Sequence, residues 1–264
     1  MWIRNKQIFK NHAQLPTVID QGDTFRIFYS YRIEGKSYIN YFEINKKLKI
    51  VYQNKNPVFK PGERGCFDDQ GVMPSCLIGD VLYYTGWNTD KGQVPYGHGI
   101  GIAIWNESKN KFERVYLGPI LDRGLNTPFL VNSPFCSCTP QGWKMWFCNG
   151  IGWDDGFPKY NICSFVSNSN KFQENYSFSQ EVGEQWEACS RPFVRNEVIY
   201  FSKKIKDSSY EIYSFHNKEL KKELELASIG WDSEMACYPY ICGEYMFYNG
   251  NGYGATGVGV CIEN

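Results

Sequence analysis

Short apolar runs recur along the chain in one fixed order. A proline is followed by apolar residues, then by a turn, an aromatic strand-like segment and a second strand-like segment. In the first copy these segments are Pro16–Ile19, Phe25–Tyr31 and Ser37–Ile44. The later copies begin at Pro74, Pro134, Pro192 and Pro239, at intervals of 58, 60, 58 and 47 residues. Since the segments are short and rich in Val, Ile, Tyr and Phe, the pattern predicts five copies of a unit built from strands.

A repeat of roughly 40 to 60 residues made of short strands is typical of a β-propeller blade. A proline fits the start of a strand, because the first residue need not donate to the ladder. Segments such as Lys49–Tyr52 and Phe112–Leu117 are predicted as outer strands of the first two copies. The sequence therefore predicts an all-β fold, with residues 1–264 forming a single five-bladed propeller domain.

The fifth copy has no outer strand after its third one, and an open blade would expose an unpaired edge. The segment Trp2–Phe9 precedes the first copy and alternates like a strand. We expect it to pair with the fifth copy, to close the ring, and to bury the side chains of Trp2, Ile3, Ile8 and Phe9.

Two alternatives concern the fold. A β-sandwich would show turn signals at short spacing but no long-range repeat of matching prolines, so the repeat favours the propeller. The segment Glu219–Leu226 contains good helix formers, and a short helix there is the alternative to an outer strand of the fourth copy.

Composition narrows the function. Aromatic residues make up 17% of the chain, which favours strands and a large buried core. The 28 basic and 28 acidic residues balance, which argues against a nucleic-acid partner or a polybasic membrane binder. No run approaches ~18 consecutive apolar residues and the first residues do not resemble a signal peptide. We therefore expect no membrane span and a cytoplasmic location.

Ten cysteines stand mostly within apolar strand-like runs, as Cys148 does in Met145–Cys148. Buried, reduced thiols in the cytosol are the expectation for such a pattern. No C-x-x-C pair occurs, and the three histidines are scattered, so neither a metal nor a cofactor is expected.

Carboxylates mark the entries of the innermost strands, which converge on the axis of a propeller. Aligned on their prolines, the second, fourth and fifth copies carry Asp69, Glu187 and Glu234 five positions before the proline. Asp68 and Asp232 stand beside them. Carboxylates gathered in one funnel repel one another, which separates acid from base roles. For any single carboxylate, a bond to turn amides is the alternative.

Aromatic residues at loop ends have polar neighbours, an arrangement suited to gripping the apolar faces and hydroxyl edges of a sugar. Trp87, Trp153 and Trp231 each stand beside Gly, Asn or Asp. The polar residues expected to contact the sugar with them are Gln14, Arg32, Asn132, Arg191 and Asn249. The segment Tyr248–Gly254 fits the same idea, with a glycine-rich hairpin turn as its alternative.

These motifs resemble the five-bladed propeller enzymes of glycoside hydrolase families 43, 32, 68 and 130. More specific is a resemblance to uncharacterised relatives found with polysaccharide-assembly genes. It rests on the segments His12–Pro16, Gly65–Ser75, Arg191–Pro192, Gly230–Pro239 and Tyr248–Gly252. The resemblance covers the whole chain at the level of blades and implies the fold.

Family 43 enzymes place carboxylates where this chain has Leu15, Ser75 and Asn132. Families 32 and 68 have Asn-Asp-Pro where this chain has Gln14-Leu15-Pro16, so the catalytic triad of these families is not carried over. We instead expect Glu187 to protonate the leaving oxygen and Asp69 to act as its partner carboxylate, tuned by Glu234 or Asp232. The expected activity is cleavage of a glycosidic bond, of a furanoside or a similarly compact sugar. Two alternatives stay open: a glycosyltransferase of cell-surface polysaccharide assembly that uses an activated sugar donor, and a non-catalytic sugar-binding propeller.

Overall fold

The computed structural model describes residues 2–89, 94–154, 157–172, 177–182, 188–204 and 209–264. The described chain is almost entirely strand, and helical structure is limited to the 3-10 turn Glu107–Lys109 and the short helix α1 (Asn251–Gly254). Each of the five repeated prolines lies in a strand that is followed by antiparallel strands. The predicted all-β class and the strand order within the copies are confirmed.

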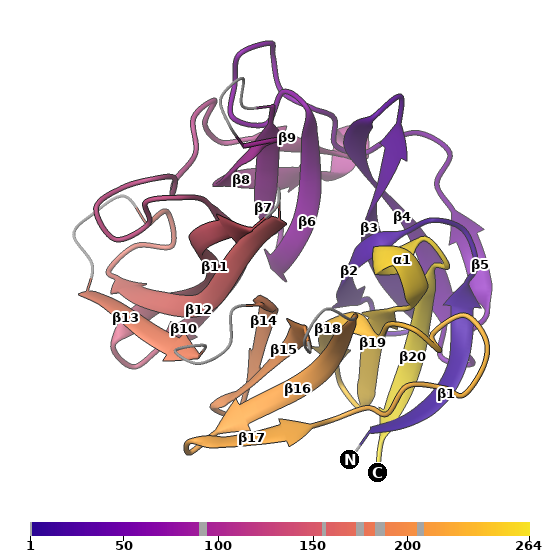
Figure 1. The fold of residues 1–264 in the computed structure, drawn as a ribbon. Coiled ribbons are helices and arrows are strands. Elements are labelled where there is room, and N and C mark those ends of the chain that lie inside the picture. The colour runs from indigo at the N-terminus through magenta and orange to yellow at the C-terminus, as the bar shows by residue number, and fades with distance from the viewer. Residues whose placement is uncertain (1, 90–93, 155–156, 173–176, 183–187, 205–208) are drawn as a thin grey trace. The chain divides into compact units, whose positions relative to one another are not determined.

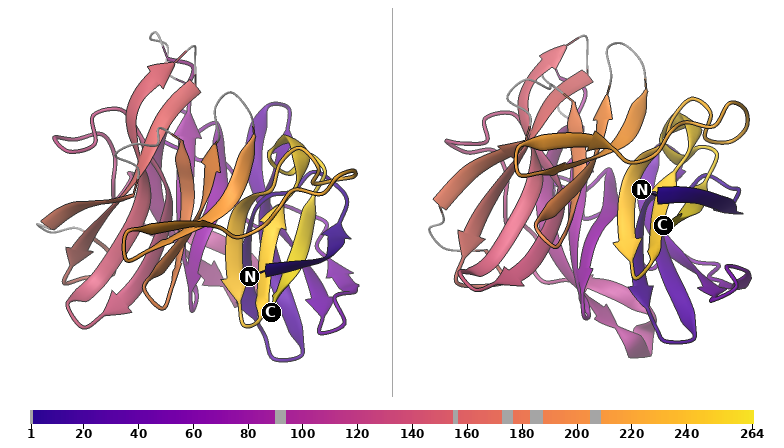
Figure 2. Two further views of the ribbon diagram at one scale, coloured as in Figure 1. Left: turned by 60° about the horizontal axis from the view of Figure 1, so that its bottom comes forward. Right: turned by 90° about the horizontal axis from the view of Figure 1, so that it is seen from below.

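The strands form several sheets, which Figures 1 and 2 show as ribbons. The first has the order β2 (Gln14–Asp20), β3 (Thr24–Ile33), β4 (Lys36–Asn45), β6 (Gly71–Ile78), β7 (Val81–Asn88), β8 (Gly97–Asn106), β9 (Lys111–Arg114), with β5 (Ile50–Gln53) on β4. The second has the order β10 (Val131–Thr139), β11 (Gly142–Asp154), β12 (Phe157–Ser167), β13 (Ser177–Val182). The third has the order β14 (Cys189–Arg195), β15 (Val198–Lys204), β16 (Tyr210–His216), β17 (Glu219–Lys222). The fourth has the order β1 (Trp2–Phe9), β20 (Val258–Glu263), β19 (Tyr245–Asn249), β18 (Cys237–Cys242).

The chain divides into two compact units. The first unit comprises Met1–Tyr31, Ile39–Pro57 and Phe193–Asn264, and the second comprises Arg32–Tyr38 and Val58–Pro192. In the second unit, Ser37 of β4 makes a single parallel bridge to Gly71 of β6, which joins two sets of strands into the first sheet.

The N-terminal strand pairs with the last strand of the chain. β1 runs antiparallel to β20, from the pair Trp2–Glu263 to the pair Phe9–Val258, and the two lie next to each other in Figure 1. This pairing is the one predicted from the sequence. Trp2 and Phe9 are buried together with Ile8, whereas Ile3 is 55% exposed. The expected burial of Ile3 is therefore wrong, because its side chain lies on the solvent face of β1.

A bulge precedes the proline in four of the five copies. Leu15, Ser133, Arg191 and Tyr238 have φ values of 61°, 53°, 53° and 59°, in the left-handed region that favours glycine. The strand register shifts at these places in β2, β10 and β18. A bulge adds one residue to a strand and leaves it without a ladder partner. Its backbone N–H therefore needs another acceptor.

Side chains of middle strands supply that acceptor in all four copies. The bonds are Leu15 N to Asn249 Oδ1 at 2.7 Å, Ser133 N to Thr85 Oγ1 at 2.8 Å, Arg191 N to Cys148 Sγ at 3.0 Å and Tyr238 N to Ser202 Oγ at 2.7 Å. The four acceptors are buried. Each bulge is thus held by a short polar side chain from the preceding copy, or from the fifth copy in the case of Leu15.

The second copy departs from this arrangement. The pair Met73–Thr85 in the second copy is equivalent to the pair Cys237–Asn249 in the fifth copy, since each is followed by a register shift. In β6 that shift lies between Pro74 and Cys76. Pro74 therefore stands at the bulge itself, where its ring excludes a positive φ. The alignment on prolines is off by one residue in this copy. Asp69 and Glu234 consequently do not occupy equivalent positions, and the shared offset that suggested a site is not real for this pair.

We expect Thr85→Val to destabilise the protein by about 1–3 kcal/mol, because it leaves the buried N–H of Ser133 without an acceptor. Thr85→Ser keeps the hydroxyl and should retain most of the stability. Urea denaturation of the three proteins measures the difference. Equal midpoints for the Val and Ser variants would show that the hydroxyl does not stabilise the bulge.

Three further expectations concern the cysteines, the segment Glu219–Leu226 and a membrane span. All ten cysteines are free, as expected. Glu219–Lys222 forms strand β17 against β16, so the outer strand is correct and the helical alternative is not. Among the described residues, no helix has the length and apolar character needed to span a membrane.

Candidate functional site

Trp87 is fixed at the end of β7 in the second unit. Its indole Nε1 donates to Ser37 Oγ at 3.1 Å. A Cβ at Gly71 would lie 2.1 Å from the same Nε1, so only glycine lets the ring approach the strand this closely. The guanidinium carbon of Arg32 lies over the ring, 5.2 Å from its centroid. The ring is therefore held in place on one edge and has a cation over a face.

Three more rings, those of His98, Tyr96 and Trp153, follow Trp87 in a row of neighbouring contacts. His98 of β8 pairs with Trp87 across the ladder, and the ring of Tyr96 stacks on His98 with centroids 4.8 Å apart. Tyr96 meets Trp153 edge to face at 5.3 Å. Tyr96 and Trp153 are half-buried and pack against the core residues Leu130, Cys148 and Tyr160. The rings are thus positioned by a packed core rather than by loops alone.

Asn132 of β10 completes this group. Its Nδ2 lies 3.1 Å from His98 Nδ1. Because an amide nitrogen only donates, Nδ1 accepts, and the proton of the neutral imidazole lies on Nε2. We name the group the Trp87 cluster: Arg32, Trp87, Tyr96, His98, Asn132 and Trp153. Four of its six members, Arg32, Trp87, Asn132 and Trp153, are sugar contacts predicted from the sequence, and the structure brings them together.

His98 is neutral under ordinary conditions. Desolvation of the ring, and secondarily the positive charge of Arg32, lower the pKa of His98 from 6.5 to about 3. Between these two values the unfolded chain binds the proton and the folded chain does not. The contribution of His98 to stability is therefore complete above pH 6.5 and declines as the pH falls toward 3.

We expect the imidazole signals of His98 in an NMR titration to stay constant from pH 8 to pH 5, because the folded-state pKa is about 3. Arg32→Gln should move the titration of His98 upward, since it removes one of the two causes of the shift. A His98 midpoint near 6.5 in the wild-type protein would contradict the desolvated geometry.

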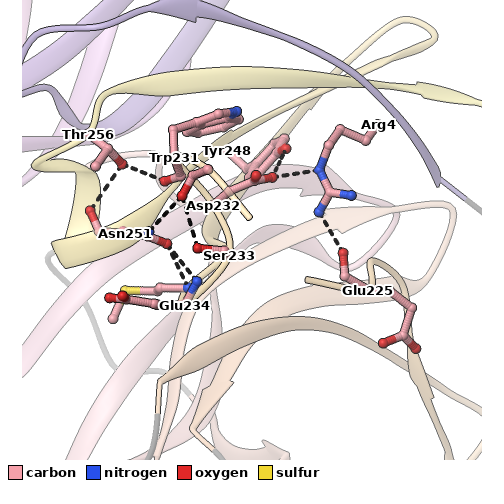
Figure 3. Close-up of polar contacts among 11 residues, drawn as sticks. Arg4, Glu225, Trp231, Asp232, Ser233, Glu234, Tyr248, Asn251 and Thr256 are labelled. Atoms are coloured by element: carbon pink, nitrogen blue, oxygen red, sulfur yellow. Dashed lines mark hydrogen bonds and ion pairs between the residues drawn. The ribbon is translucent and has the colours of Figure 1, made fainter. Parts of the chain in front are cut away.

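Asp232 is engaged within the first unit. Its side chain is 1% exposed, and its Oδ2 accepts from Arg4 Nε at 2.6 Å and from the Tyr248 hydroxyl at 2.7 Å (Figure 3). Arg4 Nη2 also donates to the carbonyl of Glu225 at 2.6 Å. A carboxylate in this position ties β1 and β19 to the loop before β18.

Asp68 repeats the arrangement in the second unit. Its Oδ2 accepts from the Tyr84 hydroxyl at 3.0 Å and from Arg114 Nε at 2.8 Å, and its side chain is fully buried. Arg114 Nη2 donates to the carbonyl of Lys60 at 2.6 Å, as Arg4 does to Glu225. Two copies thus use the same Asp–Tyr–Arg anchor. We assign Asp68 and Asp232 to this structural role and do not retain them as proposed sugar contacts.

Two more predicted sugar contacts, Trp231 and Asn249, pack and form hydrogen bonds inside the first unit. The Trp231 ring packs on Tyr248 with centroids 5.2 Å apart, and a Cβ at Gly250 would lie 2.4 Å from it. Asn249 is fully buried, and its Nδ2 donates to the carbonyls of Ala13 and Gly257 while its Oδ1 holds Leu15. These contacts favour a structural role for Asn249. The glycine-rich segment Tyr248–Gly254 comprises the end of β19 and the short helix α1, which lies between β19 and β20 in place of the hairpin turn given as its alternative.

The remaining predicted residues are not members of the Trp87 cluster. Glu234 is exposed, and its backbone N–H donates to Asn251 Oδ1 (Figure 3). Asp69 is half-buried, with Oδ2 accepting from Gly65 N at 2.9 Å and Oδ1 from Gln70 Nε2 at 3.2 Å. Arg191 is buried, and its Nη1 donates to the carbonyl of Pro74. Gln14 is half-buried in β2, and Glu187 lies outside the described residues.

Sequence reasoning missed His98 as a site residue and left Tyr96 out of the predicted contacts. A lone histidine between two glycines carries no spacing signal, since its partners Trp87, Tyr96 and Asn132 come from three separate positions in the chain. Trp87 and His98 face each other across the β7–β8 ladder, and this can be recognised only when the register of the two strands is known.

Comparison with known proteins agrees with this fold. No protein-family model matches the chain. The chain is 28% identical over 281 aligned residues to the uncharacterized protein Rv1502 of Mycobacterium tuberculosis, covering 96% of this chain and 93% of that protein. The values for the uncharacterized protein MT1551 of another strain of that species are the same.

Solved structures give the wider relationship. A glycosyl hydrolase from Bacteroides ovatus matches with a TM-score of 0.64 at 12% identity, over 96% of this chain and 84% of that one. The Bombyx mori GH32 beta-fructofuranosidase BmSUC1 matches with a TM-score of 0.62 at 15% identity, over 99% of this chain and 61% of that one. A thermostable family-43 glycoside hydrolase matches with a TM-score of 0.60 at 13% identity, over 98% and 90%.

At these identities the likeness shows the fold. The structural neighbours are propeller glycoside hydrolases, so the resemblance expected from the sequence is confirmed at the level of the fold. The chain has a glycosidase-like, all-β fold.

Proposed function

We propose that the protein is a carbohydrate-active enzyme that acts on a glycosidic bond, and that the Trp87 cluster binds the sugar. The Trp87 cluster is the observation that carries this proposal. It offers the half-buried rings of Trp87 and Trp153, together with amide, imidazole and guanidinium donors. A sugar needs apolar surfaces for its C–H faces and hydrogen-bonding groups for its hydroxyl edges. The glycosidase-like fold supports the same class of ligand.

Cleavage of a glycosidic bond needs one carboxylic acid and one partner carboxylate. We keep Glu187 as the proposed acid and Asp69 as its proposed partner, with Glu234 as a tuning group. Asp69 precedes Gln70, whose N–H donates to the Trp87 carbonyl at 3.1 Å, so its backbone lies next to the Trp87 cluster. A furanoside or similarly compact sugar remains the proposed substrate.

The proposal extends to the architecture and location of the protein. Five proline-led copies and the pairing of β1 with β20 support a five-bladed ring in which residues 1–264 form one domain. Ten free cysteines support a cytoplasmic location, because stable disulfides are rare there.

The test is a panel of aryl furanosides, aryl pyranosides, sugar phosphates and nucleotide sugars, with products identified by mass spectrometry. Release of the aryl alcohol supports the proposal. On a substrate that reacts, we expect Glu187→Gln and Asp69→Asn each to lower kcat/KM by about 10²-fold or more. Glu219→Gln, at an exposed position on β17, is the matched control and should keep the wild-type rate.

Two outcomes would contradict the proposal. Transfer of sugar from a nucleotide sugar without hydrolysis would indicate a glycosyltransferase. Saturable binding of sugars with no product from any member of the panel would indicate a sugar-binding protein without catalysis. Near-wild-type rates in both carboxylate variants would leave the activity in place but refute the assignment of Glu187 and Asp69.

A further inference from the structure

Within the part of the chain that the structure describes, several arginines form ion pairs, and Arg32 is not among them. Arg4, Arg26, Arg114 and Arg195 each pair with a carboxylate, in the order Asp232, Glu43, Asp68 and Glu263. Arg32 is exposed near the turn between β3 and β4, where its Nη1 donates to the Gly35 carbonyl at 3.1 Å. No ion pair joins it to an acidic side chain of the described residues. A guanidinium has five N–H donors, so most of those of Arg32 are available to a ligand.

The position of the Arg32 guanidinium is constrained although its side chain is exposed. It lies over the Trp87 ring, which is fixed by Ser37 and by the close approach to Gly71. A guanidinium held on an aromatic ring loses less freedom when it forms a bidentate pair with a carboxylate or phosphate. Arg32 is thus oriented in advance of any ligand.

The surroundings of Arg32 are suited to an anion. Its positive charge helps to keep His98 neutral, and the proton of the neutral ring lies on Nε2, which is a hydrogen-bond donor. Lys36, next to Ser37, adds a second cation, and its Nζ donates to the Asp69 carbonyl at 3.2 Å. The cluster itself contains no acidic side chain. The carboxylate of Asp154, beside Trp153, lies 3.6 Å from Lys159 Nζ.

We propose that the Trp87 cluster is a subsite for a sugar residue that bears a negative charge. Arg32 would pair with the carboxylate or phosphate of that residue, Trp87 and Trp153 would contact its ring, and His98 and Asn132 would position it. Carboxylate and phosphate share the planar, bidentate recognition that arginine provides. The inference rests on the proposed function and names the class of its substrate.

Isothermal titration calorimetry of the full chain tests this with matched probes. D-Glucuronate is compared with D-glucose, D-galacturonate with D-galactose, and glucose 6-phosphate with inorganic phosphate. We expect at least one acidic sugar to bind about 10-fold or more tightly than its neutral partner. Preference for the uronates identifies a carboxylate ligand, and preference for glucose 6-phosphate identifies a phosphate ligand. Added salt should weaken the binding of the acidic sugar only.

Variants locate the effect. Arg32→Gln should weaken the binding of the acidic sugar about 10-fold and weaken the binding of the neutral sugar by a smaller factor, because a neutral sugar loses a hydrogen-bond donor but no charge pair. Lys111→Gln removes a positive charge at the exposed first position of β9, close to the β8–β9 turn and far along the ladder from His98, and should change neither affinity. Thermal melts confirm that each variant is folded.

Acidic and neutral sugars that bind equally well, or an Arg32→Gln protein with full affinity for the acidic sugar, would overturn the subsite. Inorganic phosphate that binds as tightly as glucose 6-phosphate, with no preference for the uronates, would also overturn it, because the site would then recognise no sugar. The proposed function fails separately: acidic sugars would bind as expected and no glycoside would be cleaved.

Discussion

A chain that begins at Asn11 should lose its cooperative thermal transition or be insoluble. Strand β1 contributes the buried side chains of Trp2, Ile8 and Phe9, and the Phe9 ring stacks on Phe42 with centroids 4.4 Å apart. At about 1.5–3 kcal/mol for each buried side chain, their loss costs about 5–9 kcal/mol. The loss of Arg4 also leaves the buried Asp232 with the Tyr248 hydroxyl but no cation. Together these effects rival a typical total stability of about 5–15 kcal/mol.

Differential scanning calorimetry of the shortened and full chains measures this effect. Ile3→Ser is the control, because Ile3 lies on the same strand but is exposed, and it should change the stability by less than about 0.5 kcal/mol. A shortened chain that retains the melting temperature of the full chain would refute the structural role of β1.

The strand pattern of this protein could be predicted because each strand and turn is marked by residues close together in the sequence. A proline near the start of an inner strand, aromatic residues in the middle strand and a turn between them recur once in each of the five copies. The outer strand β17 followed from that period in spite of its helix formers, since the edge of β16 offered a ladder to pair with. Tertiary pairing overrides a weak local propensity.

The site could be predicted only in part, because a repeat alignment does not fix register. One bulge position differs in the second copy, where Pro74 replaces a residue with positive φ, and this shifts every residue before it by one place. Carboxylates that appeared together in the alignment then separate into anchors such as Asp68 and turn residues such as Asp69. The Trp87 cluster, by contrast, needs the ladder of β7 and β8 and the position of β10 before His98 and Asn132 can be seen to meet.

Substitution of the arginine in either Asp–Tyr–Arg anchor should strongly destabilise the protein. Arg114→Met leaves the carboxylate of Asp68 fully buried with only the Tyr84 hydroxyl as a donor from a side chain. Arg4→Met does the same to Asp232, which keeps the hydroxyl of Tyr248. Breaking a buried ion pair from one side typically costs about 3–5 kcal/mol. We therefore expect each variant to lower the melting temperature by about 10 °C, given about 2–4 °C per kcal/mol in a protein of this size.

Double variants separate the anchor from a direct role in substrate binding. Arg114→Met combined with Asp68→Leu removes both charges and should recover much of the stability that Arg114→Met alone loses, because no uncompensated carboxylate remains buried. Lys109→Met, which breaks an exposed ion pair with Glu113, is the control and should cost less than about 1 kcal/mol. If Arg114→Met and Arg4→Met instead keep the wild-type melting temperature while sugar affinity falls, then Asp68 and Asp232 belong to the binding site and the anchor assignment is wrong.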